Sequence, residues 1–340
     1  MNNEKSKQSF GPISKWKAIV AKYEQPHFWR ASWQIVNSIG LYIALWYLMY
    51  ISLSISPWLI IFQIILAGGL LVRTFIIFHD CVHGSFFISH RANVFWGYVA
   101  GMLTFTPFSH WRWLHLSHHA TSGNLEKRGM GDIQTLTVEE YLQASWSKKL
   151  IYRLVRHPLI LFVVGPILHF LILQRIPFSD AKPDERRSVW IMNILVLGFA
   201  AILISIFGLL PWAVIQLAIL AFSGSIGVWL FYVQHQFEDA YWEQAEDWDY
   251  VEAAMRGSSF YKLPRLLQWF TGNIGFHHIH HLSPRIPNYN LERCHCSSPE
   301  FAQVKTLTII SSLKLANLRL WDEKTKQLIS FRKLKRLHLL

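Results

Sequence analysis

Charged residues are scarce in this chain of 340 residues. Only 16% of the residues are Asp, Glu, Lys or Arg, while 52% are hydrophobic, and a typical soluble domain has about 25% charged residues. Acidic residues are the rarer kind, with 21 Asp and Glu against 33 Lys and Arg. This composition is typical of a protein whose surface lies mostly against lipid, so the sequence predicts an integral membrane protein.

Cysteine is also rare, with Cys81, Cys294 and Cys296 the three in the chain. The last two are too close in sequence to bridge easily, which favours a reducing cytoplasmic face without disulfides. The segment Gly129-Met130-Gly131 lacks the third glycine of a dinucleotide fingerprint and follows no buried strand, so no NAD or flavin site is expected there. An oxidoreductase built on this chain would receive its electrons from elsewhere.

The chain has neither a nucleic-acid-binding signature nor a recognisable cleavable signal peptide. The net charge of +12 comes without any RNA- or DNA-binding signature, so no nucleic acid partner is expected, and anionic lipid headgroups explain the charge better. The first apolar run is too long for a signal peptide and has no clear cleavage site, so we expect it to stay in the membrane.

Six long apolar runs are present. Four reach the roughly 20 residues that a spanning helix needs, and the runs that begin at Val94 and Leu159 fall short. We therefore predict an all-α integral membrane protein with about four transmembrane helices, two short re-entrant or interfacial helices and a cytoplasmic helical cap. The runs are Ser32–Ile55, Trp58–Phe78, Val94–Phe108, Leu159–Leu173, Val189–Leu210 and Trp212–Val233.

Basic residues lie on one side of these runs. They precede the first run, recur between Arg175 and Arg187 and fill the last forty residues, so the positive-inside rule predicts a multi-pass protein of the cell membrane with both termini and the histidine clusters in the cytoplasm. We expect one domain over 1–340. It divides into a basic lead-in (1–31), a membrane region (32–233) with a cytoplasmic insert (about 109–157), and a cytoplasmic cap (234–340). Arg73, inside the second run, is expected to snorkel.

Three histidine clusters lie at the edges of the apolar stretches, where polar groups are costly unless they bind something. Residues at i, i+3 and i+4 share one helical face, so each HxxHH pattern presents three imidazoles to one point, and HxxxH presents two. Eight imidazoles exceed the needs of one tetrahedral zinc, and a set of nitrogen ligands without thiolates suits iron, so two metals are implied. The clustered ligands are His79 and His83, then His115, His118 and His119, then His277, His280 and His281.

Further candidates lie close to the clusters. His235 ends the last apolar run at the same face and would make a ninth ligand, although a structural histidine is nearly as common at such an interface. The carboxylates of Asp80, Glu238 and Asp239 are expected to orient ring N–H groups. His278 points off the face of its cluster, so we interpret it as a bystander. The other histidines lack spaced partners and are expected to be ordinary: His27, His90, His110, His157, His169, His295 and His338.

The clusters HDCVH, HLSHH and HHIHH, at these separations, resemble the three histidine boxes of the membrane fatty acid desaturases. The resemblance covers nearly the whole chain and is closer still to the acyl-lipid delta-5 desaturases of bacilli. Four longer stretches carry it: Phe78 to Cys81, Gly123 to Ile133, Ser223 to His235, and Asn273 to Pro284.

The resemblance implies a centre of two iron ions (Fe2+/Fe3+) held by the eight box histidines and by His235, which matches an additional histidine of the family. Some relatives also use an asparagine one turn before that histidine, where this chain has Phe231, so a water or another group would complete the coordination. Asn273 is a second candidate near the ligands.

The resemblance further implies a reaction: dioxygen is reduced to water while a cis double bond, at delta-5, forms in a phospholipid acyl chain. A separate ferredoxin or flavodoxin would supply the electrons. A hydroxylase or ketolase on the same scaffold remains an alternative, as does, more remotely, a metal transporter. A transporter would need ionisable ligands along a path through the membrane, and the long runs contain little besides Arg73 and Asn193 that could serve.

Overall fold

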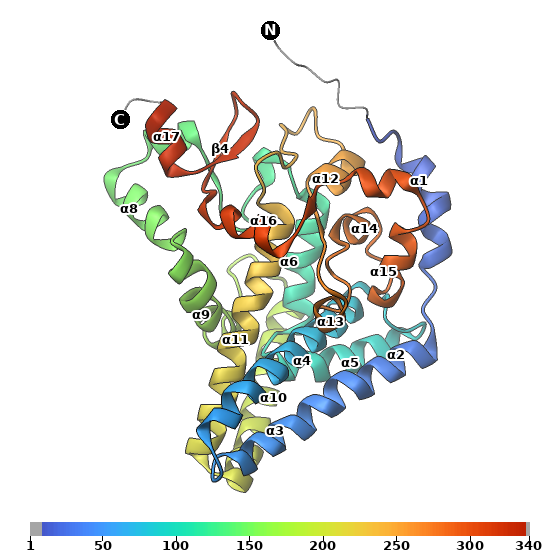
Figure 1. The fold of residues 1–340 in the computed structure, drawn as a ribbon, viewed down its shortest axis with the longest axis vertical. Helices are drawn as coiled ribbons and strands as arrows, with labels where there is room; N and C mark the ends of the chain where they lie inside the picture. The colour runs from blue at the N-terminus through green and yellow to red at the C-terminus, as the bar shows by residue number, and fades with distance from the viewer. Residues whose placement is uncertain (1–8, 338–340) are drawn as a thin grey trace.

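The computed structural model describes residues 9–337, except the side chain of Pro57. His338 and the first residues of the basic lead-in lie outside the described residues. Helices account for most of this part of the chain, and the strands are short. Figure 1 shows a bundle of long helices at one end of the molecule and smaller elements, among them α1, α12, α17 and β4, at the other.

Four segments within residues 9–337 are long and apolar enough to cross a membrane, which confirms the four predicted spanning helices. The first combines α2 and α3 through the π-helical turn Val36–Gly40, and this turn is where Ser38 enters the core. The segments are α2 (Phe28–Ile35) with α3 (Leu41–Ser52), α4 (Pro57–His83), α10 (Pro183–Phe207) and α11 (Leu209–His235).

Two of these helices continue beyond their apolar runs. α4 reaches His83, where Gly84 with φ 69° ends the helix in the left-handed conformation, and α11 reaches His235. Hydrophobicity alone predicts that these two helices end at Phe78 and Val233, because the residues that follow each of them are polar. The extra turns carry the first cluster and His235 on rigid helix ends.

The two shorter apolar runs form α5 (His90–Leu103) and a bent pair. The pair consists of α8 (Trp146–Val155) and the segment Ile160–Arg175, which includes α9 (Gly165–Leu171), and its two arms meet at 60° as a broken span or a re-entrant loop. α8 lies within the insert that we expected in the cytoplasm, yet its exposed side chains include Trp146 and Ile151, while Tyr152 is buried. This part of the insert thus turns an apolar face outward.

The remaining elements form the cap and its connections. One sheet has the order β1-β4-β5, with β1 parallel to β4 and β4 antiparallel to β5, and the other pairs β2 with β3 in parallel. The strands are β1 (Leu136–Thr137), β2 (Phe260–Tyr261), β3 (Thr306–Leu307), β4 (Leu320–Asp322) and β5 (Gln327–Ile329). The helices are α1 (Ile13–Val20), α6 (Phe108–Thr121), α7 (Val138–Gln143), α12 (Tyr250–Arg256), α13 (Arg265–Phe270), α14 (His277–Leu282), α15 (Asn288–His295), α16 (Ile309–Leu313) and α17 (Phe331–Leu337).

The cap is joined to the end of α11 through buried groups. The hydroxyl of Tyr232 donates to the carbonyl oxygens of Leu315 and Leu318, and Trp321 and Leu328 belong to the same apolar cluster as Tyr232. These contacts fix the cap over the ends of the spanning helices, where α6 and α14 meet α4 and α11.

Candidate metal centre

Nine histidines converge where the spanning helices meet the cap. They come from four elements: α4, α6, α11 and α14. α4, α6 and α14 contribute histidines at the helical spacings noted in the sequence, and α11 contributes His235 alone. The nine form two groups, and within each group the ring nitrogens that could bind a metal lie within 4.8 Å of one another.

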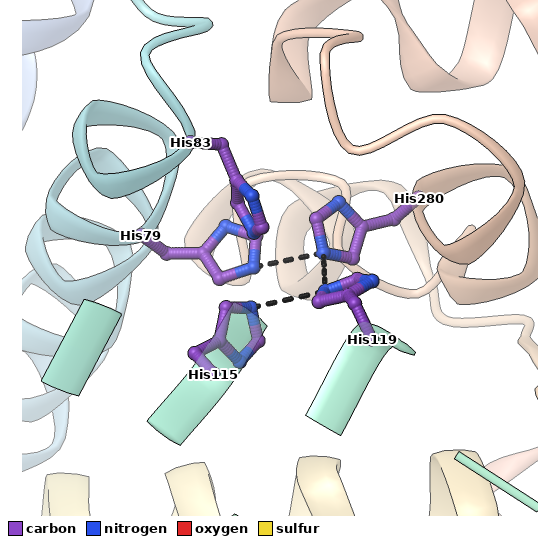
Figure 2. A group of neighbouring side chains, drawn as sticks. All are labelled: His79, His83, His115, His119 and His280. Carbon is purple, nitrogen blue, oxygen red and sulfur yellow. Dashed lines mark hydrogen bonds between the residues drawn. The ribbon is translucent and has the colours of Figure 1, made fainter. Parts of the chain in front are cut away.

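The first group contains five imidazoles, and Figure 2 shows their rings pointing toward one another. The Nε2 atom of His280 lies 2.9 Å from Nε2 of His79 and 2.9 Å from Nε2 of His119, whose own distance to Nε2 of His115 is 3.1 Å. α4, α6 and α14 thus meet around one point. The members are His79, His83, His115, His119 and His280.

The second group contains four imidazoles. The Nε2 atom of His235 lies 3.2 Å from Nε2 of His118 and 2.9 Å from Nε2 of His277, and His281 completes the group. All four are buried. His235, the ninth ligand expected from the resemblance, therefore lies with the second and third clusters.

The donor set fits two metal ions. Nitrogens bound at about 2.1 Å and at right angles would lie about 3.0 Å apart, and the short Nε2–Nε2 distances in the two groups are 2.9 to 3.2 Å. Among the described residues, Nε2 of His83 and Nε2 of His281 are buried without a hydrogen-bond partner. An unpaired buried polar atom is costly, and a metal ion at each group would remove that cost.

The electrostatics of the groups favour the neutral imidazoles that a metal requires. Burial lowers the pKa of His115, His119 and His280 well below the ordinary value, and the neighbouring histidines lower it further. The same causes, in the same order, lower the pKa of His277 and His281. These rings stay unprotonated at neutral pH, so their lone pairs are free to bind a cation.

Two carboxylates accept hydrogen bonds from rings of the two histidine groups. Nδ1 of His79 donates to Oδ1 of Asp80 over 3.1 Å, and Nδ1 of His118 donates to Oδ1 of Asp132. A carboxylate at Nδ1 fixes the proton there and leaves Nε2 with its lone pair. Asp80 was a candidate from the sequence. Asp132 was not, because it lies in the loop after α6 and its distance along the chain gives no helical relation to His118.

Asp80 is in turn held by hydrogen bonds from Asn288, which Asn273 contacts. Its Oδ2 accepts from the backbone N–H and from Nδ2 of Asn288, at 2.7 and 2.8 Å. The side chain of Asn273 donates to the carbonyl oxygen of Asn288 at 3.2 Å. Asn273 thus lies two hydrogen bonds from Asp80 and contacts no ligand ring through a hydrogen bond.

The other two predicted carboxylates lie beside lysines. Oδ1 of Asp239 accepts from Nζ of Lys305 at 2.6 Å, and Glu238 lies 3.9 Å from Nζ of Lys314. The helix ends at His235, so Glu238 and Asp239 lie beyond its end. In their place, Nδ1 of His235 donates to the carbonyl oxygen of Gly257 at 3.1 Å.

His278 does not join the histidines that lie beside it in the sequence. Its Nε2 atom lies 3.0 Å from Nδ1 of His295, and it belongs to neither group. Phe231 packs its ring against His118 and His235, with ring centroids 5.1 and 5.4 Å apart. An apolar side chain therefore occupies the place of the asparagine that some relatives use.

Fold and site together define an all-α, multi-pass membrane protein with two buried histidine groups that could each hold a metal ion. Comparison with known proteins gives the family. The family model of the fatty acid desaturases matches residues 56–308. A fatty acid desaturase of Bacillus subtilis (strain 168) is 49% identical over 316 residues, which cover 93% of this chain and 90% of the relative.

More distant relatives include two enzymes of Synechocystis (strain PCC 6803). An sn-1 oleoyl-lipid 12-desaturase is 29% identical over 74% of this chain and 72% of its own length. An sn-1 acyl-lipid omega-3 desaturase (ferredoxin) is 27% identical over 67% of this chain and 64% of its own length. The chain belongs to the fatty acid desaturase family and is an oxidoreductase.

Proposed function

We propose that the protein is an acyl-lipid desaturase that introduces a cis double bond, at delta-5, into acyl chains of membrane phospholipids. It would use two iron ions, dioxygen and electrons from a separate ferredoxin or flavodoxin. Two electrons, two protons and the two hydrogens removed from adjacent carbons reduce one dioxygen to two waters, which balances the reaction.

The observation that carries this proposal is the pair of buried imidazole groups, one of five rings and one of four. Ligands without thiolate suit iron among the first-row metals. A pair of iron ions bound there would supply the oxidising power to remove hydrogen from an unactivated methylene with dioxygen.

The protein's own groups keep the site ready for the metals. Asp80 and Asp132 hold a proton on Nδ1 of His79 and of His118, so that each Nε2 presents its lone pair. Most of the nine rings are buried, so bulk water is kept from the reacting carbons. The ligands lie at helix ends, whose packing limits their movement.

A small cavity, lined by none of the nine histidines, lies among the spanning helices. It lies between α3, α5, α10 and α11, and its lining is mostly apolar and aromatic. The polar lining group Gln216 is already engaged, because its Oε1 accepts from Nε1 of Trp46 and from the hydroxyl of Tyr42. The lining of the cavity includes Met102, Leu103, Phe105, Val196, Phe199 and Trp212.

The donor, the acyl-lipid substrate and the orientation belong to the proposal as well. The similarity to an sn-1 oleoyl-lipid 12-desaturase and to an sn-1 acyl-lipid omega-3 desaturase (ferredoxin) supports an acyl-lipid substrate, and the second of these relatives supports ferredoxin as the donor. The distribution of Lys and Arg supports termini and metal site in the cytoplasm. We also propose a single domain over 1–340, since the cap shares its apolar cluster with α11.

The test is expression in a bacterium that lacks unsaturated acyl chains, with dioxygen and a donor supplied. Mass spectrometry of the fatty acid methyl esters should show chains lighter by two hydrogens, and derivatisation should locate the bond at delta-5. The His118→Ala variant should insert into the membrane and leave the chains saturated. Fully saturated chains with the unaltered protein would overturn the proposal.

Product mass decides between the proposal and a hydroxylase or ketolase, and a flux measurement in vesicles decides between it and a transporter. A hydroxylase or ketolase would give products heavier by oxygen, and a transporter would move metal across vesicle membranes without consuming oxygen. A double bond at another position of the acyl chain would support a desaturase and contradict the delta-5 position.

A further inference from the structure

Two short helices of the cap turn apolar side chains outward. On α13, Leu266 and Leu267 are 66% and 40% exposed, and on α16, Ile310 and Leu313 are 83% and 62% exposed. A cap surrounded by water would gain nothing from this arrangement, because each of these side chains would lose contact with the apolar core.

The two helices follow neighbouring strands of one small sheet. β2 and β3 are parallel, with Tyr261 opposite Leu307, so the chain leaves both strands at the same end of the small sheet. α13 follows β2 and α16 follows β3. The hydroxyl groups of Tyr261 and Ser312 lie 3.0 Å apart and hold α16 to β2.

α13 also contacts a spanning helix inside its membrane segment. A Cβ atom at Gly69 would lie 2.7 Å from Cδ1 of Phe270, so the glycine lets α13 approach α4 closely. Arg73 donates from Nη1 to the carbonyl oxygen of Trp269, and its guanidinium lies 4.2 Å from the centre of the Trp269 ring. Gly69 and Arg73 belong to the candidate span Trp58–His83, so α13 packs directly on a helix that is long and apolar enough to cross a membrane.

This contact explains the arginine in a spanning helix. We expected Arg73 to snorkel, but its side chain is buried, and its Nε also donates to Oγ of Ser38 at 3.0 Å. The guanidinium adds a hydrogen bond to the Trp269 carbonyl in the last turn of α13, which also accepts from the backbone N–H of Gly272 at 3.1 Å. The arginine therefore ties α13 to α4.

Basic side chains border the apolar surface. Lys262 and Arg265 are exposed at the start of α13, and among residues 9–337 no carboxylate lies within ion-pair distance of either. Lys314 follows α16, and its nearest carboxylate, Glu238, is 3.9 Å away. Apolar residues bordered by Lys and Arg are typical of helices that lie in the interface of an anionic membrane.

We propose that α13 and α16 form a lipid-facing wedge, whose apolar side chains enter the leaflet on the metal side of the membrane. Lys262, Arg265 and Lys314 of this wedge bind the phosphates of anionic phospholipids. The wedge seats the cap, which carries the third histidine cluster, against the bilayer from which an acyl chain would come. This inference does not depend on the proposed reaction, since lipid contact can be measured without turnover.

The depth of the wedge can be measured with spin labels on the full chain in phosphatidylcholine/phosphatidylglycerol nanodiscs. Cys81 and Cys294 are buried, so Cys296→Ser gives a background without an exposed thiol. A label at Ile310→Cys should collide several-fold more with oxygen than with a water-soluble nickel chelate. A label at Lys324→Cys, exposed between β4 and β5, should show the opposite preference. Equal nickel access at both sites would overturn the proposal. The apolar surface of α13 and α16 would then be a contact for another protein or for a second copy of this chain.

The headgroup contact has its own test. Spin-labelled phosphatidylglycerol should associate with the protein more strongly than spin-labelled phosphatidylcholine, and this preference should fall in a variant with Lys262→Gln and Arg265→Gln. A variant with Lys335→Gln and Arg336→Gln on α17 removes the same charge and should keep the preference. An equal fall in both variants, or no fall in the first, would overturn the role of Lys262 and Arg265.

Discussion

Asp132 accepts a hydrogen bond from Nδ1 of His118, on the side of the ring that faces away from the second histidine group. The carboxylate belongs to the loop after α6, and Gly131 beside it has φ 75° and lies against the backbone of Leu114. A Cβ atom at Gly131 would lie 2.7 Å from the carbonyl oxygen of Leu114, so only glycine lets the loop approach α6 this closely. This close approach of the loop to α6 places Asp132 within hydrogen-bond distance of the His118 ring.

The Asp132→Asn variant should therefore bind metal more weakly and lose activity. The neutral amide neither fixes the proton on Nδ1 nor raises the basicity of Nε2, and such changes typically cost 10–100-fold in affinity or rate. Iron content by mass spectrometry and turnover per iron measure the two effects. Asp239→Asn is the matched control, because Asp239 pairs with Lys305 and should change neither quantity. Equal effects of the two variants would remove the role of Asp132.

His235 and His278 allow a direct comparison of a ligand with a buried bystander. His235→Ala should lower the iron content and reduce activity by more than about 100-fold. The variant loses the proposed imidazole ligand together with its hydrogen bond to the Gly257 carbonyl oxygen. His278→Gln should keep both, because the ring of His278 meets His295 and neither group. Membrane insertion should be the same in both variants. Full iron content in His235→Ala would show that the second group is not a metal site.

Part of this site could be predicted from the sequence alone. Helical spacing placed His115, His118 and His119 on one face, and the same rule separated His278 from its cluster. The spacing could not divide the nine histidines into groups of five and four, because His118 and His119 are neighbours that join different groups. That division depends on where α11 and α14 pass α6, which is tertiary structure.

Carboxylates were harder to predict. Glu238 and Asp239 were chosen for their closeness to His235 in sequence, whereas the partner of that ring is the carbonyl oxygen of Gly257. Once a helix ends, distance along the chain no longer gives distance in space. The four spanning helices followed from hydropathy, but the apolar faces of α8 and α13 did not, since short amphipathic helices in water and at a membrane share the same pattern.

The metal-free protein should lose stability as the pH falls through the ordinary histidine range. Burial lowers the pKa of His277, His280 and His281 in the folded state, and the unfolded chain binds protons near pH 6.5. Below that pH the unfolded state binds more protons than the folded one, so the stabilisation present above pH 6.5 is lost as the pH falls. Thermal unfolding in detergent between pH 8 and pH 5 measures it. An unfolding temperature that stays constant over this range would contradict the prediction.

Gly101, in the last turn of α5, should not tolerate a larger residue. A Cβ atom there would lie 2.6 Å from the carbonyl oxygen of Thr106 and 3.0 Å from Cε2 of Phe78, and the backbone N–H of Thr106 donates to the carbonyl of Gly101 at 2.7 Å. Because a backbone atom cannot move aside as a side chain does, Gly101→Ala should destabilise the protein by about 1–3 kcal/mol. It should also lower iron content, since α6 carries the second histidine cluster. Gly198→Ala, on α10, is the control.

At Gly198 nothing lies within 4 Å of an added Cβ atom, so alanine there should be neutral or stabilise the helix by up to about 1 kcal/mol. Thermal unfolding and iron content of the two variants, measured side by side in detergent, separate the loss of space at Gly101 from the general effect of replacing a helical glycine. If both variants unfold at the same temperature, the close approach of Thr106 to Gly101 does not limit the position of α6, and the metal groups depend on other contacts for their alignment.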